Sequence, residues 1–337
     1  MLEYPLESAA VHSDNRILVG DVGGTHARFA VVEPSDSGRW RIFQRLDLAE
    51  SFATFNNALL SYLQRAGVSP LPPIAAIAVA GPVAAGTARF TNRGWDISEQ
   101  TLRNVGFERA LLINDFAALA FGVDLLDEQH LHTIGPRLKG LEGETITILG
   151  AGTGFGVSCL ARFGDRAVPM ATEGGHIGFA PSNAQELAAV QLMWKQSERV
   201  SVERILSGGG LEHLYRTLEQ LAGRAAQPLT AAEISAAALR NEAGPRVALT
   251  MFCSIFGAVA GDLALAHGAR GGVYIAGGIA EKIEEFLMQS PFRGRFEDKG
   301  RMTAYVSAIP THLIVNPDIA LLGAARSGIL LARAASK

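Results

Sequence analysis

The chain has 337 residues, of which 48% are hydrophobic and 19% charged, so it can bury a large core and is long enough for two domains. Its net charge of -3, without a basic stripe, argues against nucleic acid as a main partner. Cys159 and Cys253 lie far apart in apolar stretches, and no Cys-x-x-Cys metal motif occurs, which is typical of a reduced cytoplasmic protein.

The beginning of the chain lacks a basic start and an apolar run. It is therefore not a secretory signal, and we expect a flexible tail over residues 1–16. From Ile17 onward, short apolar runs alternate with helical patterns, which indicates an α/β protein. The predicted strands are Ile17–Asp21, Phe29–Val32, Ile74–Ala80, Ala110–Ile113, Thr145–Leu149, Val157–Leu160, Val273–Ala276 and Leu313–Val315.

Capping residues and apolar patterns predict several helices. Phe116–Leu126 has a helical pattern. Ser182-x-x-Gln185 has the spacing of a capping box that opens a helix through Ser197, and Thr230-x-x-Glu233 opens another helix.

The stretch Val247–Ala266 is apolar enough to cross a membrane and contains Gly257-x-x-x-Gly261. A helix buried inside the protein is the better interpretation. The stretch stands alone, Asp262 would lie inside the bilayer, and no basic flank sets an orientation. We therefore expect no membrane partner, and the small residues allow a helix or a ligand to approach closely.

The stretch Leu18–Val32, "LVGDVGGTHARFAVV", reads as a strand, an acidic residue, a glycine turn and a second strand. Backbone N–H groups in a glycine turn form a concave anion site, and the hydroxyl of Thr25 adds a donor. Asp21 stands at the mouth of this turn, where it suits Mg²⁺ bound through water. The alternatives are an ordinary hairpin turn and an aspartate that stabilises it.

A second turn of this kind occurs at Gly150–Gly156, with Thr153 at its centre. Two such hairpins indicate two related halves that grip a triphosphate. A third glycine pair, Gly277–Gly278, follows a strand and precedes a helix, where it suits an adenine ring or only a tight turn. Neither hairpin fits a Walker A loop or a Rossmann fingerprint, because no Gly-Lys pair and no helix follow as those motifs require.

Polar side chains gather in three further places. Asn114 and Asp115 follow an apolar strand, where they suit hydroxyl binding and general-base chemistry or, alternatively, helix capping. Glu173 and His176 lie on a glycine-rich loop that suits neutral polyol binding. Glu203 is predicted in the first turn of a short helix capped by Ser201, where the helix dipole alone also favours a carboxylate.

Read in order, these motifs resemble those of bacterial glucokinases, in the group that lacks a zinc-binding cysteine motif and belongs to the actin–hexokinase superfamily. The resemblance runs from about Ile17 to near the C-terminus. Its motifs are "DVGGT", "INDF", "GAGTGFGV", "EGGHIGFAP", "ERILSG", "FEDKGR" and "AGGI". His26 departs from the pattern, since asparagine is expected after Thr25, and the tail before Ile17 is longer than expected.

The resemblance implies a two-lobed α/β fold with a ligand cleft between the lobes, a smaller lobe at 17–125 plus 317–337 and a larger lobe at 126–316. It implies a homodimer that binds ATP with Mg²⁺ and acts on D-glucose, with Asp115 as the base. The implied glucose contacts are Asn92, Asn114, Asp115, Glu173, His176 and Glu203. The implied ATP contacts are Gly23, Gly24, Thr25, Gly152, Thr153, Gly154, Gly277 and Gly278.

The activity implied is the phosphorylation of D-glucose by ATP to glucose 6-phosphate, the entry step of glycolysis. A kinase for another hexose and a weakly active glucose-sensing regulator remain as alternatives. A panel of sugars separates the first alternative, and sugar binding without turnover would favour the second.

Overall fold

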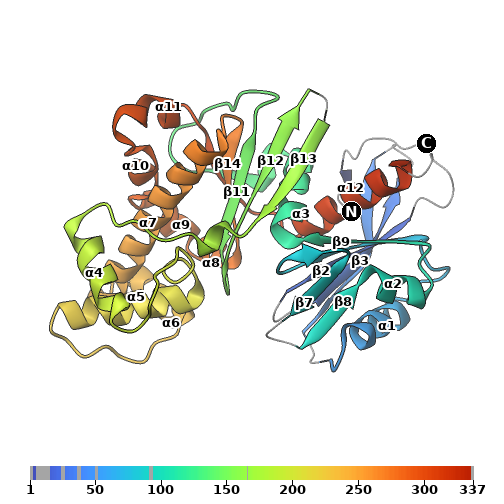
Figure 1. Cartoon of the computed structure of the whole chain (residues 1–337), viewed down its shortest axis with the longest axis horizontal. Helices are drawn as coiled ribbons and strands as arrows, with labels where there is room; N and C mark the ends of the chain where they lie inside the picture. The colour runs from blue at the N-terminus through green and yellow to red at the C-terminus, as the bar shows by residue number, and fades with distance from the viewer. Residues whose placement is uncertain are drawn as a thin grey trace. The chain divides into compact units, whose positions relative to one another are not determined.

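The computed structural model of the chain describes residues 3–4, 16–23, 27–35, 39–49, 52–90, 94–164 and 166–334. Gly24, Thr25, His26 and Asn92 lie outside these ranges, so their roles stay predictions. Helices and strands alternate along the described chain, as Figure 1 shows, and the α/β class is confirmed.

The chain divides into two compact units. Unit 1 comprises Met1–His130, Val168–Ala171 and Asn316–Lys337, and unit 2 comprises Leu131–Ala167 and Thr172–Val315. Part of the expected N-terminal tail is held in unit 1: β1 (Glu3–Tyr4) pairs with β4, and the Tyr4 side chain is buried.

Unit 1 is built on a six-stranded sheet in the order β1-β4-β3-β2-β5-β9. The hairpin β2–β3 is antiparallel, whereas β2, β5 and β9 run parallel to one another. A small second sheet joins β6, β7 and β8. The bounds are β2 Ile17–Val22, β3 Ala27–Pro34, β4 Trp40–Leu48, β5 Ile74–Val79, β6 Val83–Ala84, β7 Thr87–Phe90, β8 Trp95–Ser98 and β9 Arg109–Asn114.

The central strands of the main sheet in unit 1, β2 and β5, are apolar on both faces, and helices cover both faces. Helix α1 (Phe55–Arg65) and α2 (Glu99–Val105) pack on the face that contains Phe29 and Ile77. Helix α3 (Asp115–Gly122) and α12 (Ile319–Ala334) contribute to the core on the other face. Short 3-10 turns at Val123–Leu125 and Glu128–His130 follow α3.

Unit 2 repeats the central arrangement of unit 1. Its six-stranded sheet has the order β10-β15-β14-β11-β12-β13. The hairpin β11–β12 is antiparallel, and β11, β14 and β15 run parallel, as β2, β5 and β9 do. The predicted relationship between the two glycine hairpins is therefore confirmed. The bounds are β10 Leu131–Thr133, β11 Ile146–Ala151, β12 Phe155–Phe163, β13 Arg166–Thr172, β14 Gly272–Ala276 and β15 Thr311–Ile314.

The helices of unit 2 form its second layer beside the sheet (Figure 1). Helix α6 begins with the capping box predicted at Thr230 and Glu233. The bounds are α4 Ala184–Trp194, α5 Gly208–Leu221, α6 Ala231–Leu239, α7 Ala243–His267, α8 Gly278–Lys282, α9 Glu284–Gln289, α10 Phe292–Glu297 and α11 Thr303–Ser307, with 3-10 turns at Gly174–His176 and Gly300–Met302.

Two predicted helix starts are wrong. Helix α4 is capped by Asn183, whose side chain accepts a hydrogen bond from Glu186 N, because Ser182 instead donates to the Glu186 carboxylate. No helix begins at Ser201: residues 201–207 form a hydrogen-bonded turn, and α5 begins only after Ser207. Ser201 does cap this turn, since its Oγ accepts a hydrogen bond from Arg204 N at 3.3 Å. Val202 N and Glu203 N donate to the neighbouring loop at Ile177 O and Gly175 O, and Leu206 N donates within the turn to Val202 O at 2.8 Å.

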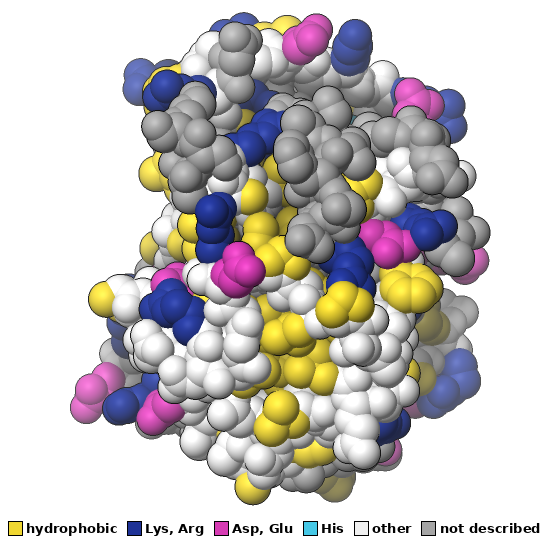
Figure 2. All heavy atoms as spheres, turned by 90° about the vertical axis from the view of Figure 1, so that its right-hand side faces the viewer, with side chains coloured by type: hydrophobic (Ala, Val, Ile, Leu, Met, Phe, Trp, Pro, Cys, Tyr) yellow, Lys and Arg dark blue, Asp and Glu magenta, His cyan; other side chains and the backbone are white. Residues whose placement is uncertain are grey.

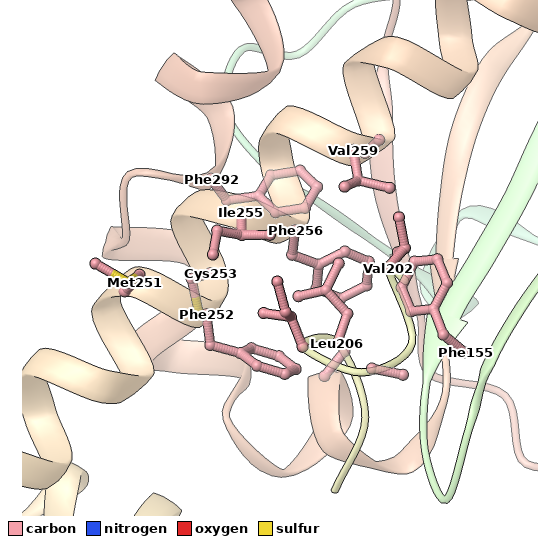
Figure 3. Packing of buried hydrophobic residues seen from close by; sticks show 14 of the residues in the cluster. Phe155, Val202, Leu206, Met251, Phe252, Cys253, Ile255, Phe256, Val259 and Phe292 are labelled. Atoms are coloured by element: carbon pink, nitrogen blue, oxygen red, sulfur yellow. The ribbon is translucent and has the colours of Figure 1, made fainter. Parts of the chain in front are cut away.

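Helix α7 is the central core element of unit 2. It is the one helix in the described residues that is long and apolar enough to cross a membrane, and 78% of its most apolar window is buried. Phe252 and Phe256 pack against Phe292 and other apolar side chains, as Figure 3 shows. Its one acidic residue, Asp262, pairs with Lys299 Nζ at 2.8 Å.

The glycines of α7 allow the backbone of α10 to pack closely against it. A Cβ atom at Gly257 would lie 2.0 Å from the carbonyl oxygen of Phe292 in α10. Gly257→Ala is therefore expected to destabilise the protein by about 1–3 kcal/mol, because backbone atoms must move. The matched control is Gly294→Ala in α10, where a Cβ meets nothing within 4 Å and should stabilise by about 0.5–1 kcal/mol. Urea denaturation measures both, and equal effects would refute the packing argument.

The surface in Figure 2 shows how the charges are distributed on one face. Lys and Arg side chains are interspersed there with Asp, Glu and hydrophobic side chains. The described side chains of this face do not form the continuous basic stripe that is typical of nucleic-acid binding.

Candidate active site

The parallel strands of unit 1 bring Asp21 and Asn114 to one edge of the sheet. Val22 on β2 aligns with Val79 on β5, and Val79 aligns with Asn114 on β9. Neighbouring strands are about 4.8 Å apart, so the two polar positions lie roughly two strand spacings from each other. Asp115 follows directly as the first residue of α3.

Asn114 is the N-cap of α3. Its Oδ1 accepts a hydrogen bond from Ala117 N at 3.0 Å, and its Nδ2 donates to the carbonyl oxygen of Gly81 at 3.1 Å. The capping alternative is thus realised for this residue. A contact between Asn114 and a sugar hydroxyl stays a prediction, and it would use the second N–H of the same amide.

Asp115 is half-buried at the N-terminus of α3. Its Oδ1 accepts a hydrogen bond from Phe116 N at 2.8 Å. The helix dipole favours the negative form of a carboxylate at this end of a helix, and the local hydrogen bond limits its rotation. A deprotonated and oriented carboxylate is what a general base requires.

Asp21 faces Arg28 across the β2–β3 hairpin, with 3.8 Å between Oδ2 and the guanidinium. Arg28 is shared, because its Nε also donates to Asp47 Oδ1 at 2.9 Å. Burial raises the pKa of Asp21 above the ordinary aspartate range, and the attraction of Arg28 offsets this only in part. Arg28 was not among the predicted site residues, because the register that sets it opposite Asp21 is given only by the β2–β3 pairing.

The second hairpin, between β11 and β12, makes a tight turn at Gly152–Gly154. Gly152 N donates to Gly154 O at 2.8 Å, and Gly208 N donates to Gly152 O at 2.8 Å. Thr153 is exposed at the tip. The turn is thus held at its base by α5, while the tip faces solvent and can meet a phosphate.

The glycine pair at the start of α8 lies beside this hairpin. Ala276 on β14 pairs with Gly150 on β11. Gly277 has φ +94°, and a Cβ there would lie 2.5 Å from the carbonyl oxygen of Ala151, so only glycine fits. At Gly278 a Cβ would meet nothing within 4 Å. The two glycine turns therefore lie side by side in unit 2.

Glu173, His176 and Glu203 are brought together in unit 2. His176 Nε2 lies 3.8 Å from Glu173 Oε2, and His176 Nδ1 lies 3.9 Å from Glu203 Oε1. These separations are longer than hydrogen bonds, so the three side chains keep bonding capacity for a ligand. The glycine loop forms a single 3-10 turn at Gly174–His176, where no helix was expected.

One carboxylate, that of Glu203, joins His176 to the β11–β12 hairpin. Glu203 Oε2 accepts a hydrogen bond from Phe155 N at 2.8 Å, directly after the glycine turn. The backbone N–H of Glu203 donates to Gly175 O at 2.9 Å. Phe155 and Val202, which flank this contact, are both buried against α7 (Figure 3). The position of Glu203 is therefore set by the core of unit 2.

No cluster of three or more His, Cys, Asp or Glu side chains suited to a metal ion occurs in the described residues. Asp21 and Asp115 lie in unit 1, and Glu173, His176 and Glu203 lie in unit 2.

Solved structures define the class of this fold. A glucokinase from an Antarctic psychrotroph has a TM-score of 0.84 and 36% identity, covering 94% of this chain and 99% of that one. A ROK-family glucokinase from Streptomyces griseus, solved with glucose and AMPPNP, has a TM-score of 0.63 and 18% identity over 94% of this chain and 99% of that one. The fold is that of the sugar kinases.

The sequence comparison is more specific. The glucokinase family model matches residues 18–329. A glucokinase from Caulobacter sp. (strain K31) is 45% identical over 309 residues, which cover 91% of this chain and 93% of the relative. The chain belongs to the glucokinase family, and the resemblance drawn from its motifs is confirmed.

Proposed function

We propose that this protein transfers the γ-phosphoryl group of ATP to the 6-hydroxyl of D-glucose. The observation that carries the proposal is the double engagement of Glu203, which holds the hairpin at Phe155 N and also faces His176. A cluster that can bind hydroxyl groups lies next to a glycine hairpin that can bind phosphate. This arrangement suits transfer of a phosphoryl group from a nucleotide to a sugar. Membership of the glucokinase family supports the same reaction.

Asp115 is the proposed base. Its carboxylate would accept the proton of the attacking 6-hydroxyl, and its hydrogen bond from Phe116 N keeps it oriented. Glu173, His176 and Glu203 are the proposed readers of the other sugar hydroxyls, together with Asn114 and Asn92. Phosphoryl transfer depends mainly on positioning and electrostatic stabilisation, so a single proton acceptor is sufficient.

The glycine turns are the proposed ATP site. Gly23, Gly24 and Thr25 would bind phosphate in unit 1, and Gly152, Thr153 and Gly154 would bind it in unit 2. Gly277 and Gly278 would lie against the adenosine. The tight turn at Gly152–Gly154 and its neighbour at Gly277 support this assignment.

Mg²⁺ is the proposed metal, held through water near Asp21. The charge of the Asp21 carboxylate is only partly compensated by Arg28. Such a single carboxylate fits Mg²⁺, which binds few protein ligands directly and keeps several water molecules. When bound, Mg²⁺ supplies positive charge to the phosphate oxygens. Asp21 would orient its water ligands, and Arg28 would hold Asp21.

Asp21→Asn is expected to lower kcat/KM for MgATP about tenfold or more and to raise Tm at neutral pH. The pKa of Asp21 is raised in the folded state, so folding binds its proton more tightly and the ionised carboxylate destabilises the fold. The gain in Tm should therefore disappear as the pH falls below the ordinary aspartate pKa. Mg²⁺ titrations and thermal scans at several pH values test this, and an unchanged Mg²⁺ requirement would remove Asp21 from the metal site.

We propose that unit 1 and unit 2 correspond to the smaller and larger lobes expected at 17–125 plus 317–337 and at 126–316. We also propose a cytoplasmic homodimer. Sedimentation of the purified protein measures the oligomeric state directly.

The direct test of the reaction mixes the protein with glucose, ATP and Mg²⁺ and measures glucose 6-phosphate. Glucose should be the best acceptor in a panel that includes mannose and fructose, and a higher kcat/KM for either would make the protein another hexose kinase. Glucose binding without turnover would favour a sugar-sensing regulator.

A further inference from the structure

A cavity of about 550 Å³ in unit 2 is lined both by proposed sugar-binding residues and by basic residues. Its lining includes His176 and Glu203, and also Arg204, His213 and Arg216. An adjoining cavity of about 440 Å³ shares His176 and Arg204. The residues that would bind glucose hydroxyls therefore continue into a group of basic side chains.

The two arginines of this cavity are not neutralised within the described chain. Neither Arg204 nor Arg216 forms an ion pair with a described residue. Burial lowers the pKa of His213, and the nearby charges of Arg216 and Arg204 lower it further, so His213 is neutral and the arginines supply the positive charge. Five other arginines of unit 2 are paired with a carboxylate: Arg224–Glu219, Arg240–Glu242, Arg270–Glu144, Arg293–Glu297 and Arg295–Glu186.

The two cavities also contain carboxylates, which disfavour an anion that has no other groups. Glu203 lines the same cavity and Glu198 lines the adjoining one, so a bare anion meets repulsion as well as attraction. Carboxylates accept hydrogen bonds from hydroxyl groups, whereas guanidinium groups bind phosphate through paired N–H donors. A ligand that satisfies both must carry hydroxyls and a phosphate in one molecule.

We propose that this cavity binds a sugar phosphate, with its hydroxyls on Glu203 and His176 and its phosphate on Arg204 and Arg216. The cavity volume lies in the range that holds small organic ligands. Since the sugar part occupies Glu203 and His176, the ligand excludes glucose. The expected competition with glucose rests on the proposed function of Glu203 and His176 as glucose-binding residues. The phosphate contact with Arg204 and Arg216 does not depend on that proposal.

The test titrates the whole protein, without ATP, by calorimetry with glucose 6-phosphate, glucose 1-phosphate and orthophosphate. At least one ester should bind more tightly than orthophosphate, and saturating glucose should abolish its binding. Arg204→Gln and Arg216→Gln should each weaken ester binding about tenfold or more, the factor for losing a charge-assisted hydrogen bond. Arg301→Gln, an exposed arginine of the same unit, is the matched control and should change binding less than twofold.

Three results would overturn the proposal: neither ester binds, orthophosphate binds as tightly as the esters, or Arg301→Gln weakens binding as much as Arg216→Gln. The test of the cavity site can be distinguished from the test of the proposed glucose phosphorylation. Ester binding that depends on Arg204 and Arg216 supports the cavity site even if glucose is not phosphorylated. Glucose phosphorylation without ester binding refutes only the cavity site.

Discussion

Asp115→Asn is expected to lower kcat by about 10²–10⁴-fold, the usual contribution of a general base. The amide oxygen of asparagine can still accept the hydrogen bond from Phe116 N that Asp115 Oδ1 accepts at 2.8 Å. The start of α3 should therefore keep its geometry, and the variant loses only the ability to take a proton. Thermal denaturation should show a Tm close to that of the parent protein.

The control is Asp127→Asn, which removes an equal charge from an exposed position of unit 1. Its kcat should stay within about twofold, as is usual for surface substitutions away from functional groups. Glucose binding by the Asp115 variant, measured by calorimetry, separates lost chemistry from lost affinity. A near-normal kcat in that variant would show that another group accepts the proton.

The central strands were predictable from sequence because they are apolar on both faces. All eight predicted strands are present, and β2, β5 and β11 are buried along nearly their whole length. Strands near the sheet edges were missed. β4 carries Arg41, Arg45 and Asp47 among its apolar residues, and β13 contains Pro169, so their pairing depends on a neighbour and not on a local apolar run.

Local motifs predict the elements of the candidate site only where a short pattern defines them. The turns at Gly152–Gly154 and Gly277–Gly278 and the strand ends bearing Asp21 and Asn114 follow from short patterns, and the motifs together indicated the correct family. Contacts between distant segments leave no such pattern. Nothing in the sequence near Glu203 indicates that its carboxylate bonds to Phe155 N, 48 positions away. The bonds from Val202 N and Glu203 N to the loop at Ile177 and Gly175 leave no such pattern either.

Glu203→Gln is expected to lower kcat/KM for glucose about 10²-fold, because a charged acceptor of sugar hydroxyls becomes neutral and one of its oxygens becomes an N–H donor. The remaining amide oxygen can still accept the hydrogen bond from Phe155 N. The hairpin at Gly152–Gly154 should therefore keep its shape, and KM for ATP should change less than threefold. Steady-state kinetics with each substrate varied in turn measure both constants.

Glu203→Ala separates the two tasks of this carboxylate. Alanine removes the sugar acceptor and also leaves Phe155 N without its partner, which frees the hairpin next to it. The loss for glucose should match or exceed that of Glu203→Gln, and KM for ATP should now rise about tenfold. A rise in KM for ATP that appears only in the alanine variant would connect the two substrates through one side chain. If both variants leave KM for ATP unchanged, the bond to Phe155 N does not support the nucleotide, and the Gly152–Gly154 turn loses its assignment as a phosphate clamp.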